Sequence, residues 1–555
     1  MPPVALNDDV LRHVVSFLHG RDALQVALCS KHMSDLALPR VAAIAICESP
    51  RDLRETWKYM LSGTPPRVQY LEELYISYFT FDYPAQDAEA AQQLFSDYWH
   101  FSDVSLIGDL LLQAPRMRRV TLERLHPCLR VDPRIGQALA SMDRLVAADF
   151  STVADSTFAL MPPMNENLRR LRLWYFWDED DHLPGETKTL PPLLTTLGRY
   201  RHLHTLELWN LDPPADGVRQ YFSADTMPSL SSIRNLKFHM VSVGALELVE
   251  FCPNLLSVDF ALAQDEPVAN LPDGPQWPHL RRLTLSTFRV IPSLLNRLQT
   301  VDQLQITDTL EMGEENAENE EDEEDNVTEL LKLIERTSPI GMSLSVASES
   351  APTMFWSRVA ALAPRLRSMQ LTVLLVGLSL ANKYWLDALP DALRPLPLMH
   401  LSLGIPRAYD VSKPPPLGES EVSDSPAADG RLDADTSEVE WQLAETIAAL
   451  PAGLAAAIPT LRLLSMTSAL HYRDILEGPA RPDDELHRRF RRSESRFGDD
   501  TMDVRYWRIV VDGQQRYVKE VSAISEEAER MRALAVAVGR GDALVGLIDR
   551  LLSPL

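Results

Sequence analysis

One spacing of apolar residues recurs along most of the chain and constrains its fold more than any other feature. The motif is six residues long and has apolar residues at its first, fourth and sixth positions. It recurs at intervals mostly of about 20 to 35 residues. The pattern reads VAAIAI at 41–46, LEELYI at 71–76, MRRVTL at 117–122, LVAADF at 145–150, LRRLRL at 168–173, LHTLEL at 203–208, IRNLKF at 233–238, LLSVDF at 255–260, LRRLTL at 280–285, VDQLQI at 301–306, LRSMQL at 366–371, LMHLSL at 398–403 and LRLLSM at 461–466.

Each occurrence of this spacing predicts a short strand. Side chains of a strand alternate between its two faces, so the last two apolar residues face the core together. A helical segment and a proline precede many of the motifs, as in DLLLQAPRMRRVTL and LAAAIPTLRLLSM, and proline ends a helix. Each unit is therefore expected to be a helix, a turn and a strand, and neighbouring units must stack because one unit cannot bury its own apolar edge.

This arrangement resembles a leucine-rich repeat array over residues 41–470. The resemblance implies an α/β solenoid in the form of an irregular horseshoe, because the spacing is uneven and the Asn or Cys that often follows the strand in that family is mostly missing. We expect disordered insertions at about 311–326, which is acidic, and 408–440, which is rich in Pro, Ser and acidic residues. Residues 471–555 are expected to cap the array with a hairpin at 505–521 and with helices, one of them capped by Ser525.

Residues 1–40 carry a helical rather than a strand periodicity. Asn7 or an aspartate after it is expected to cap a first helix that Gly20 ends. Asp22 is expected to cap a second helix, and a third is expected to end before Pro39. The apolar stripe of the first helix consists of Val10, Leu11, Val14, Val15, Phe17 and Leu18.

The stretch LNDDVLRHVVSFLHGRDALQVALCSKHMSDLA resembles the F-box motif, with Asn7 where that family has proline and Met33 near its usual aromatic residue. The resemblance implies a substrate-recognition subunit of an SCF-type cullin-RING ubiquitin ligase. In that family the F-box docks on the Skp adaptor and the repeats hold the protein to be ubiquitinated. Some apolar residues of this module must instead pack it against the first repeat, because one stripe cannot serve both surfaces. The adaptor contacts that the resemblance implies are Leu6, Val10, Leu11, Val14, Leu18, Leu24 and Leu28.

The strand residues between the inward-facing ones are candidates for binding the substrate protein. Aromatic residues and arginine contribute most of the binding energy at protein interfaces, so Trp174 and Trp209 form the preferred pair. Large aromatics at strand ends can equally cover the neighbouring repeat, and that alternative stays open. The substrate-contact candidates are Tyr75, Arg172, Trp174, Glu207 and Trp209, and the same alternation selects Lys237, His239, Gln305 and Gln370.

The charge of the chain favours a protein partner. A net charge of −25 repels nucleic-acid phosphates and anionic membranes and suits a basic protein. The most apolar run, at 371–381, is too short to span a bilayer. Four cysteines without a CxxC pair, and no visible signal peptide, lead us to expect a reducing compartment, cytoplasmic or nuclear.

Motifs of catalysis are not found in the sequence. It contains no GxxxxGK phosphate loop, GxSxG elbow or HExxH zinc motif, and His202 and His204 are typical of a strand surface. We therefore expect a non-catalytic protein with no metal and no cofactor. The second hypothesis is a leucine-rich repeat scaffold that binds a protein and has no ubiquitin-ligase role.

Overall fold

The fold was analysed in a computed structural model. It describes residues 7–81, 101–176, 187–213, 229–262, 277, 279–310, 320–347, 353–375, 380–405, 433–468, 503–512 and 515–521. The chain divides into two compact units, which we call unit 1 (Met1–Leu255 and Phe260–Ala269) and unit 2 (Leu256–Asp259 and Asn270–Leu555).

The described strands follow one another in the sheet in the order of the chain. In unit 1, strands β1 to β7 pair in parallel. In unit 2, β9 to β14 pair in parallel, and β15 and β16 are antiparallel. The strands are β1 (Ile44–Cys47), β2 (Glu73–Ile76), β3 (Arg119–Leu122), β4 (Ala147–Val153), β5 (Arg170–Tyr175), β6 (Thr205–Trp209), β7 (Asn235–Val241), β8 (Ser257–Leu262), β9 (Leu280–Leu285), β10 (Val301–Leu310), β11 (Gly341–Ala347), β12 (Ser368–Leu374), β13 (His400–Ile405), β14 (Leu463–Ser468), β15 (Asp503–Asp512) and β16 (Gln515–Val521).

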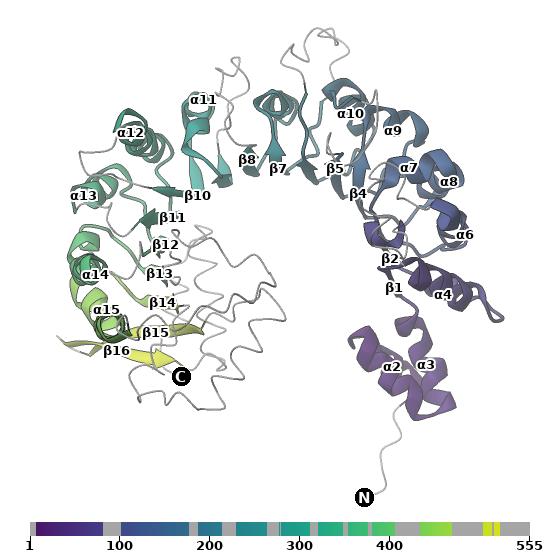
Figure 1. Cartoon of the computed structure of the whole chain (residues 1–555), viewed down its shortest axis with the longest axis horizontal. Coiled ribbons are helices and arrows are strands. Elements are labelled where there is room, and N and C mark those ends of the chain that lie inside the picture. The colour runs from purple at the N-terminus through teal and green to yellow at the C-terminus, as the bar shows by residue number, and fades with distance from the viewer. Residues whose placement is uncertain are drawn as a thin grey trace, which may run out of the picture. The chain divides into compact units, whose positions relative to one another are not determined.

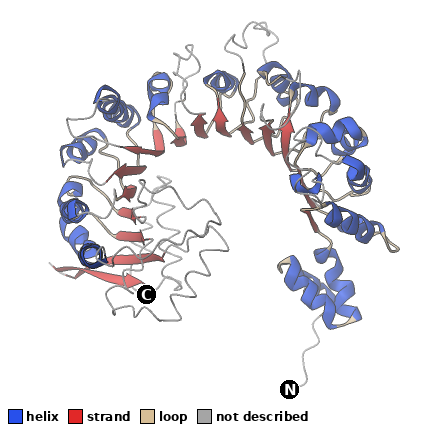
Figure 2. Ribbon diagram, viewed as in Figure 1, coloured by secondary structure: helices blue, strands red, loops and turns tan. Residues whose placement is uncertain are grey.

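Among the described residues, the helices that follow β1 connect the parallel strands and lie on one face of the sheet within each unit (Figures 1 and 2). This α/β arrangement agrees with the expected order of helix, turn and strand. In unit 1 the helices are α1 (Asp8–Ser16), α2 (Gly20–Cys29), α3 (Lys31–Val41), α4 (Pro50–Leu61), α6 (Val104–Leu112), α7 (Leu125–Val131), α8 (Arg134–Ser141), α9 (Asp155–Leu160) and α10 (Leu190–Leu197), with 3-10 turns η1 (Arg67–Tyr70), η2 (Tyr78–Phe81), η3 (Phe101–Asp103) and η5 (Val243–Phe251). In unit 2 they are η6 (Phe288–Val290), α11 (Ile291–Leu295), α12 (Glu320–Thr337), α13 (Thr353–Leu362), α14 (Leu380–Leu393) and α15 (Asp433–Ala457).

The apolar motif predicts the buried face of the strands correctly after the first motif. Leu171 and Leu173 of β5, for example, are buried, and the register aligns Leu171 with Leu206 on the next strand. Matching apolar residues on neighbouring strands therefore form continuous rows under the helices, and each such side chain contributes about 1.5–3 kcal/mol when fully buried.

The first motif is the exception, because the other set of alternate residues of its strand faces the core. In β1 it is Ala45 and Cys47 that are buried, whereas Ile44 and Ile46 are 38% and 57% exposed. Both frames of this stretch are apolar, so periodicity alone does not separate them. The inward positions hold the smaller side chains, where α4 packs against β1 and buries Leu53.

Two regions expected to be disordered contain the starts of helices. Of the insertion at 311–326, the part from Glu320 belongs to α12; of the insertion at 408–440, the part from Asp433 belongs to α15. Residues 311–319 and 408–432 lie outside the described residues. Acidic side chains at a helix start are favoured by the helix dipole, so an acidic run is compatible with a helix that later buries Leu330.

The interval between the motifs at 301 and 366 also contains a strand that the sequence pattern missed. In β11, Met342 and Leu344 face the core, and Pro339 stands where the motif has its first apolar residue. The stretch before β11 therefore lacks the first apolar residue of the motif.

The hairpin expected at 505–521 is confirmed. Strands β15 and β16 pair antiparallel down to Asp512 and Gln515, and β15 pairs with β14, with Leu464 opposite Trp507. The hairpin thus covers the edge of β14, as expected of a capping element. The helix expected to begin at Ser525 lies outside the described residues.

The N-terminal module has three helices, but the end of α1, the start of α2 and the end of α3 differ from expectation. Asn7 caps α1 and accepts a hydrogen bond from the Asp9 backbone, as expected. Gly20 begins α2 instead of ending α1, with His19 rather than Asp22 at the cap position. Helix α3 continues through Pro39 to Val41, because only the last turn follows the proline and few helical hydrogen bonds are lost.

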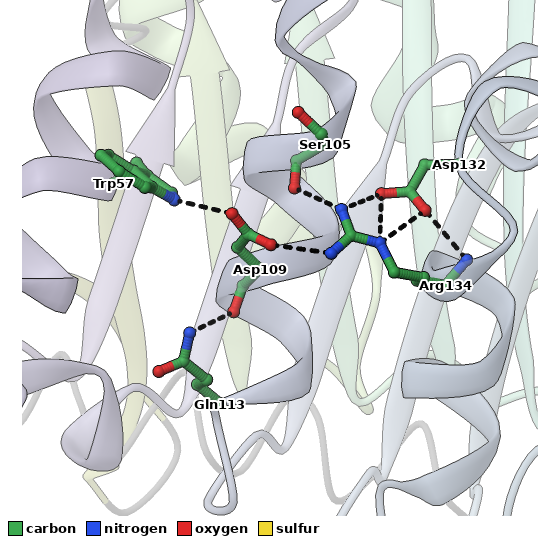
Figure 3. A network of polar contacts seen from close by, with 6 residues as sticks. All are labelled: Trp57, Ser105, Asp109, Gln113, Asp132 and Arg134. Carbon is green, nitrogen blue, oxygen red and sulfur yellow. Dashed lines mark hydrogen bonds and ion pairs between the residues drawn. The ribbon is translucent and has the colours of Figure 1, made fainter.

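A polar network ties three helices of unit 1 together on the helical face of the sheet (Figure 3). Arg134 at the start of α8 donates to Asp132 Oδ2 at 2.8 Å and to Asp109 Oδ1 of α6 at 3.0 Å. Trp57 of α4 donates from its indole nitrogen to Asp109 Oδ2 at 3.3 Å. The Asp132 and Asp109 carboxylates raise the pKa of Arg134, so this residue stays charged and holds α6 and α8 together.

Replacing Gly108 by alanine is expected to destabilise the protein by about 1–2 kcal/mol, because overpacking outweighs the gain in helix propensity. A Cβ atom at Gly108 would lie 2.5 Å from Asp132 Oδ2 and would push that carboxylate away from Arg134. Gly20→Ala in α2 is the matched control, because nothing lies within 4 Å of the added Cβ. Urea unfolding of both variants is the measurement, and equal midpoints would contradict the prediction.

Candidate functional site

Helices α1 and α2 expose two rows of apolar side chains. In α1 and its C-cap residue the row is Val10, Val14 and Phe17, and in α2 it is Leu24 and Leu28. Residues three or four positions apart lie on the same side of a helix, so each row forms a ridge along one helix. Phe17 is 74% exposed and Leu28 is 72% exposed, which is unusual for such large apolar residues.

The core of this module is small. Its buried cluster consists of Val15, Ala23 and Ala37. Leu18, Val26, Ala27 and Val41 pack against that cluster. A module with so little buried apolar area is weakly stable alone, so covering its ridges with a partner would contribute to its stability.

The sequence-predicted adaptor contacts are placed differently by the structure. Val10, Val14, Leu24 and Leu28 are exposed, whereas Leu11 is half-buried. Leu18 packs against the core of the module itself, and Leu6 lies outside the described residues. The candidate set did not include Phe17, although its spacing from Val10 and Val14 in the helical stripe would have selected it.

Strands β4 to β7 of unit 1 bring charged and aromatic side chains together on the face of the sheet opposite the described helices. The register places Asp149, Arg172, Glu207 and Lys237 side by side at one level. Two residues further along the strands, it places Ser151, Trp174, Trp209 and His239 side by side. We call these eight residues the β4–β7 cluster.

Glu207 is the centre of this cluster. Its side chain is only 2% exposed, yet its carboxylate lies 2.9 Å from Arg172 Nε and 3.5 Å from an Arg170 nitrogen. The Trp209 indole donates a hydrogen bond to Glu207 Oε1 at 3.0 Å. Lys237 Nζ lies 4.0 Å from the other carboxylate oxygen. Three cationic groups, two on β5 and one on β7, therefore share one buried carboxylate.

The two carboxyl groups of the cluster have opposite pKa shifts. Burial by itself raises the pKa of Glu207, but the Trp209 hydrogen bond and the Arg172 charge outweigh it and hold that pKa below its ordinary value. Burial raises the pKa of Asp149, and the nearby Arg172, 2.9 Å away, only partly offsets this. Glu207 is thus the anion that the cluster stabilises.

Above this ion network, three aromatic rings stack from strand to strand. The ring centroids of Trp174 and Trp209 are 4.7 Å apart with 21° between the planes. Those of Trp209 and His239 are 4.1 Å apart with 20° between the planes. We call this run the aromatic ladder, and it holds each of the three rings in a fixed orientation.

Four of the five predicted substrate contacts therefore belong to one cluster: Arg172, Trp174, Glu207 and Trp209. The fifth, Tyr75 on β2, is separated from them by β3 and β4 and donates a hydrogen bond to Glu123 Oε1 at 2.9 Å. The prediction did not include Asp149, which the strand register places beside Arg172. It also did not include Arg170, whose long side chain reaches Glu207. Gln305 and Gln370 lie in unit 2, where Ser343 stands between them in register.

The described residues offer no group of three His, Cys, Asp or Glu side chains arranged to hold a metal ion. Three of the four cysteines are buried, and burial raises the pKa of Cys47 to about 11 and that of Cys252 to about 12. These thiols are therefore protonated at neutral pH and pack as small apolar groups. Among the helices in the described ranges, none has the length and apolar character needed to cross a membrane.

Comparison of the sequence with protein-family models found no match, and comparison with curated proteins found none either.

Proposed function

We propose that the chain is the substrate-recognition subunit of an SCF-type ubiquitin ligase. The helical module α1–α3 would act as an F-box that docks on an Skp-type adaptor, and the strands of a leucine-rich repeat solenoid would bind the protein to be ubiquitinated. The observation that carries the proposal is the pair of exposed apolar ridges on a module that has almost no core of its own.

The ridges support docking because each is a row of exposed apolar side chains along one helix. Contiguous exposed apolar side chains cost free energy in water and mark protein interaction sites. Polar contacts fix the module internally: the Arg40 guanidinium donates to the Leu18 carbonyl at 2.7 Å, and Ser30 caps α3. The ridges are therefore not needed to hold the three helices together.

The β4–β7 cluster supports the second half of the proposal. Tryptophan and arginine are among the residues most enriched in interface hot spots. Here Trp174 and Trp209 stack on each other, and Arg172 is paired with Glu207. Side chains that are already ordered lose little conformational entropy on binding. Within unit 1, the described connecting helices lie on the opposite face of β5 and β6 from this cluster (Figure 2).

The test is co-purification of the tagged full chain with an Skp-type adaptor and a cullin. Phe17→Asp combined with Leu28→Asp is expected to abolish capture, because neither carboxylate can be buried in an apolar contact without a large desolvation cost. Ser16→Asp combined with Gln25→Asp is the matched control, since it adds the same charge to exposed positions of the same helices and should keep the adaptor.

Two results would contradict the proposal. If the wild-type chain captures no adaptor, the alternative of a repeat scaffold without a ligase role is favoured. If the Phe17/Leu28 variant captures as much adaptor as the control does, the ridges are not the docking surface. Circular dichroism of both variants establishes that the helices remain folded.

A further inference from the structure

Strand β1 lies at one end of the sheet, and no described strand pairs with its outer edge (Figure 1). The Cys47 carbonyl accepts a hydrogen bond from the Ser77 backbone N–H at 2.9 Å, so the backbone groups of the odd-numbered residues of β1 point toward β2. Backbone groups of successive residues in a strand point to opposite sides. The N–H and C=O groups of Ile44 and Ile46 are therefore directed outward, where an added strand could pair with them.

The side chains of Ile44 and Ile46 make this edge apolar. Both are exposed, and the buried residues of the strand face the other way. Strand edges in native proteins are commonly protected by charged side chains, because an unprotected edge pairs with other chains. Strand β16, at the other end of the sheet, follows this rule with exposed Lys519 and Glu520. The isoleucines of β1 do not, so its outer edge has the composition of an interaction surface.

Two carboxylates lie at the C-terminal end of this edge. Glu48 directly follows β1, and strand alternation places it on the same face as Ile44 and Ile46. It is exposed and is in no ion pair among the described residues. Its backbone N–H donates to Asp52 Oδ2 at 3.3 Å, which brings a second carboxylate to this position. A cationic side chain in an added strand would be attracted to this end of the edge.

We propose that the outer edge of β1 binds an extended segment of a basic partner protein as an additional strand. The segment would run antiparallel to β1, since antiparallel pairs are slightly more stable than parallel ones. Its backbone would bond to Ile44 and Ile46, and two apolar residues at alternate positions would pack on their side chains. A lysine or arginine two positions before the first of these residues would lie beside Glu48.

A second copy of the chain fits this edge less well than a basic partner does. Each copy carries a net charge of −25, so two copies repel each other. The β1 segment of a second copy would also bring the carboxylate of Glu48 rather than a cation. The inference goes beyond the proposed function, because this edge uses neither the ridges of α1 and α2 nor the β4–β7 cluster.

The probe is the peptide Ac-TKTVTVT-amide, titrated into the full chain and followed through the methyl NMR signals of Ile44 and Ile46. In an added antiparallel strand, the N–H groups of the two valines face β1, and those of the two threonines that follow them face away. N-methylation of the two valines therefore removes donors to the edge. N-methylation of those two threonines is the matched control, because it adds the same groups on the other side of the peptide.

We expect the unmethylated peptide and the threonine-methylated control to shift both methyl signals. The valine-methylated peptide should bind at least about tenfold more weakly than the control, for the loss of two backbone hydrogen bonds. Ile44→Ser combined with Ile46→Ser should weaken the unmethylated peptide at least about tenfold, measured by saturation transfer to the peptide, because its valines lose their apolar contacts. Circular dichroism shows that this variant stays folded.

The charge at the end of the edge has its own test. Glu48→Gln should weaken the lysine peptide about two- to threefold, as expected for an exposed ion pair. The same variant should leave unchanged the binding of a peptide with glutamine in place of the lysine. An equal effect on both peptides would remove Glu48 from the site.

Equal binding of the two methylated peptides would overturn the inference, because side-chain contact alone would then account for binding. Absence of any shift at Ile44 and Ile46 would overturn it too, and so would binding that survives the double serine variant. A dimer in sedimentation that Ile46→Asp dissociates would assign the edge to a second copy instead. Adaptor capture is measured separately, and its failure would leave this result unchanged.

Discussion

Replacing Trp209 by alanine is expected to lower the free energy of unfolding of strands β5 to β7 by about 3.5 kcal/mol. Trp209 is the middle ring of the ladder, so its loss removes two stacking contacts of about 1 kcal/mol each. It also removes the indole donor to the Glu207 carboxylate, and a hydrogen bond to a charged group is worth roughly 1.5 kcal/mol. Native-state hydrogen exchange of the amides in these strands measures the change.

Two further variants separate these contributions. Trp174→Ala removes only one stacking contact, so it should cost about 1 kcal/mol. Trp209→Phe keeps an aromatic ring between its neighbours but has no donor, so it should lose mainly the hydrogen bond to Glu207. If Trp174→Ala and Trp209→Ala destabilise the strands equally, the ladder is a set of separate surface side chains and not a coupled structure.

The sequence predicts the strands and their buried faces well, because the residues of a strand that face the core must be apolar and they occur at every second position. It fails where that requirement is weak. In β1 both frames are apolar, and Ile44 and Ile46 turn outward while Ala45 and Cys47 turn in. In β11 the proline at 339 replaces an apolar residue without changing the strand that follows.

The candidate site was predicted in part for a related reason. Alternation selects Arg172, Trp174, Glu207 and Trp209 as residues of one face, and the order of strands along the chain places them side by side. It does not reveal that Glu207 is buried beneath other polar groups, because no local pattern encodes ion pairs between strands. Arg170 joins the cluster only through the reach of its side chain to Glu207.

The N-terminal module shows the limit of a helical stripe as a signal. The stripe of α1 contains both Val15, which is buried, and Phe17, which is exposed, and the sequence treats them alike. Which of them faces inward depends on how α2 and α3 pack, and that packing is set by small residues such as Ala23 and Ala37. A short helix with apolar residues on more than one side is ambiguous until its neighbours are placed.

Replacing Glu207 by glutamine is expected to destabilise unit 1 by about 2 kcal/mol at neutral pH. Glutamine has nearly the same shape as glutamate and can still accept the hydrogen bond from Trp209. The change in stability therefore measures the contribution of the negative charge. Removing one member of a fully buried ion pair costs ~3–5 kcal/mol. The cost is smaller here because Arg170 and Lys237, at 42% and 43% exposed, reach water when their partner is lost. Urea unfolding followed by hydrogen exchange in β5 to β7 is the measurement.

The effect of Glu207→Gln should also depend on pH in a defined direction. The folded state lowers the pKa of Glu207, so its charge stabilises the fold at pH values above the ordinary glutamate pKa, and this contribution is lost as the pH falls through the lowered value. The difference in stability between wild type and variant should therefore close on acidification. Glu73→Gln is the matched control on the same face of the sheet: Glu73 is 44% exposed and 3.8 Å from Arg119, so it should change stability by less than about 0.5 kcal/mol. A gap between wild type and Glu207→Gln that stays constant from neutral to acid pH would show that the carboxylate charge is not what holds the cluster together.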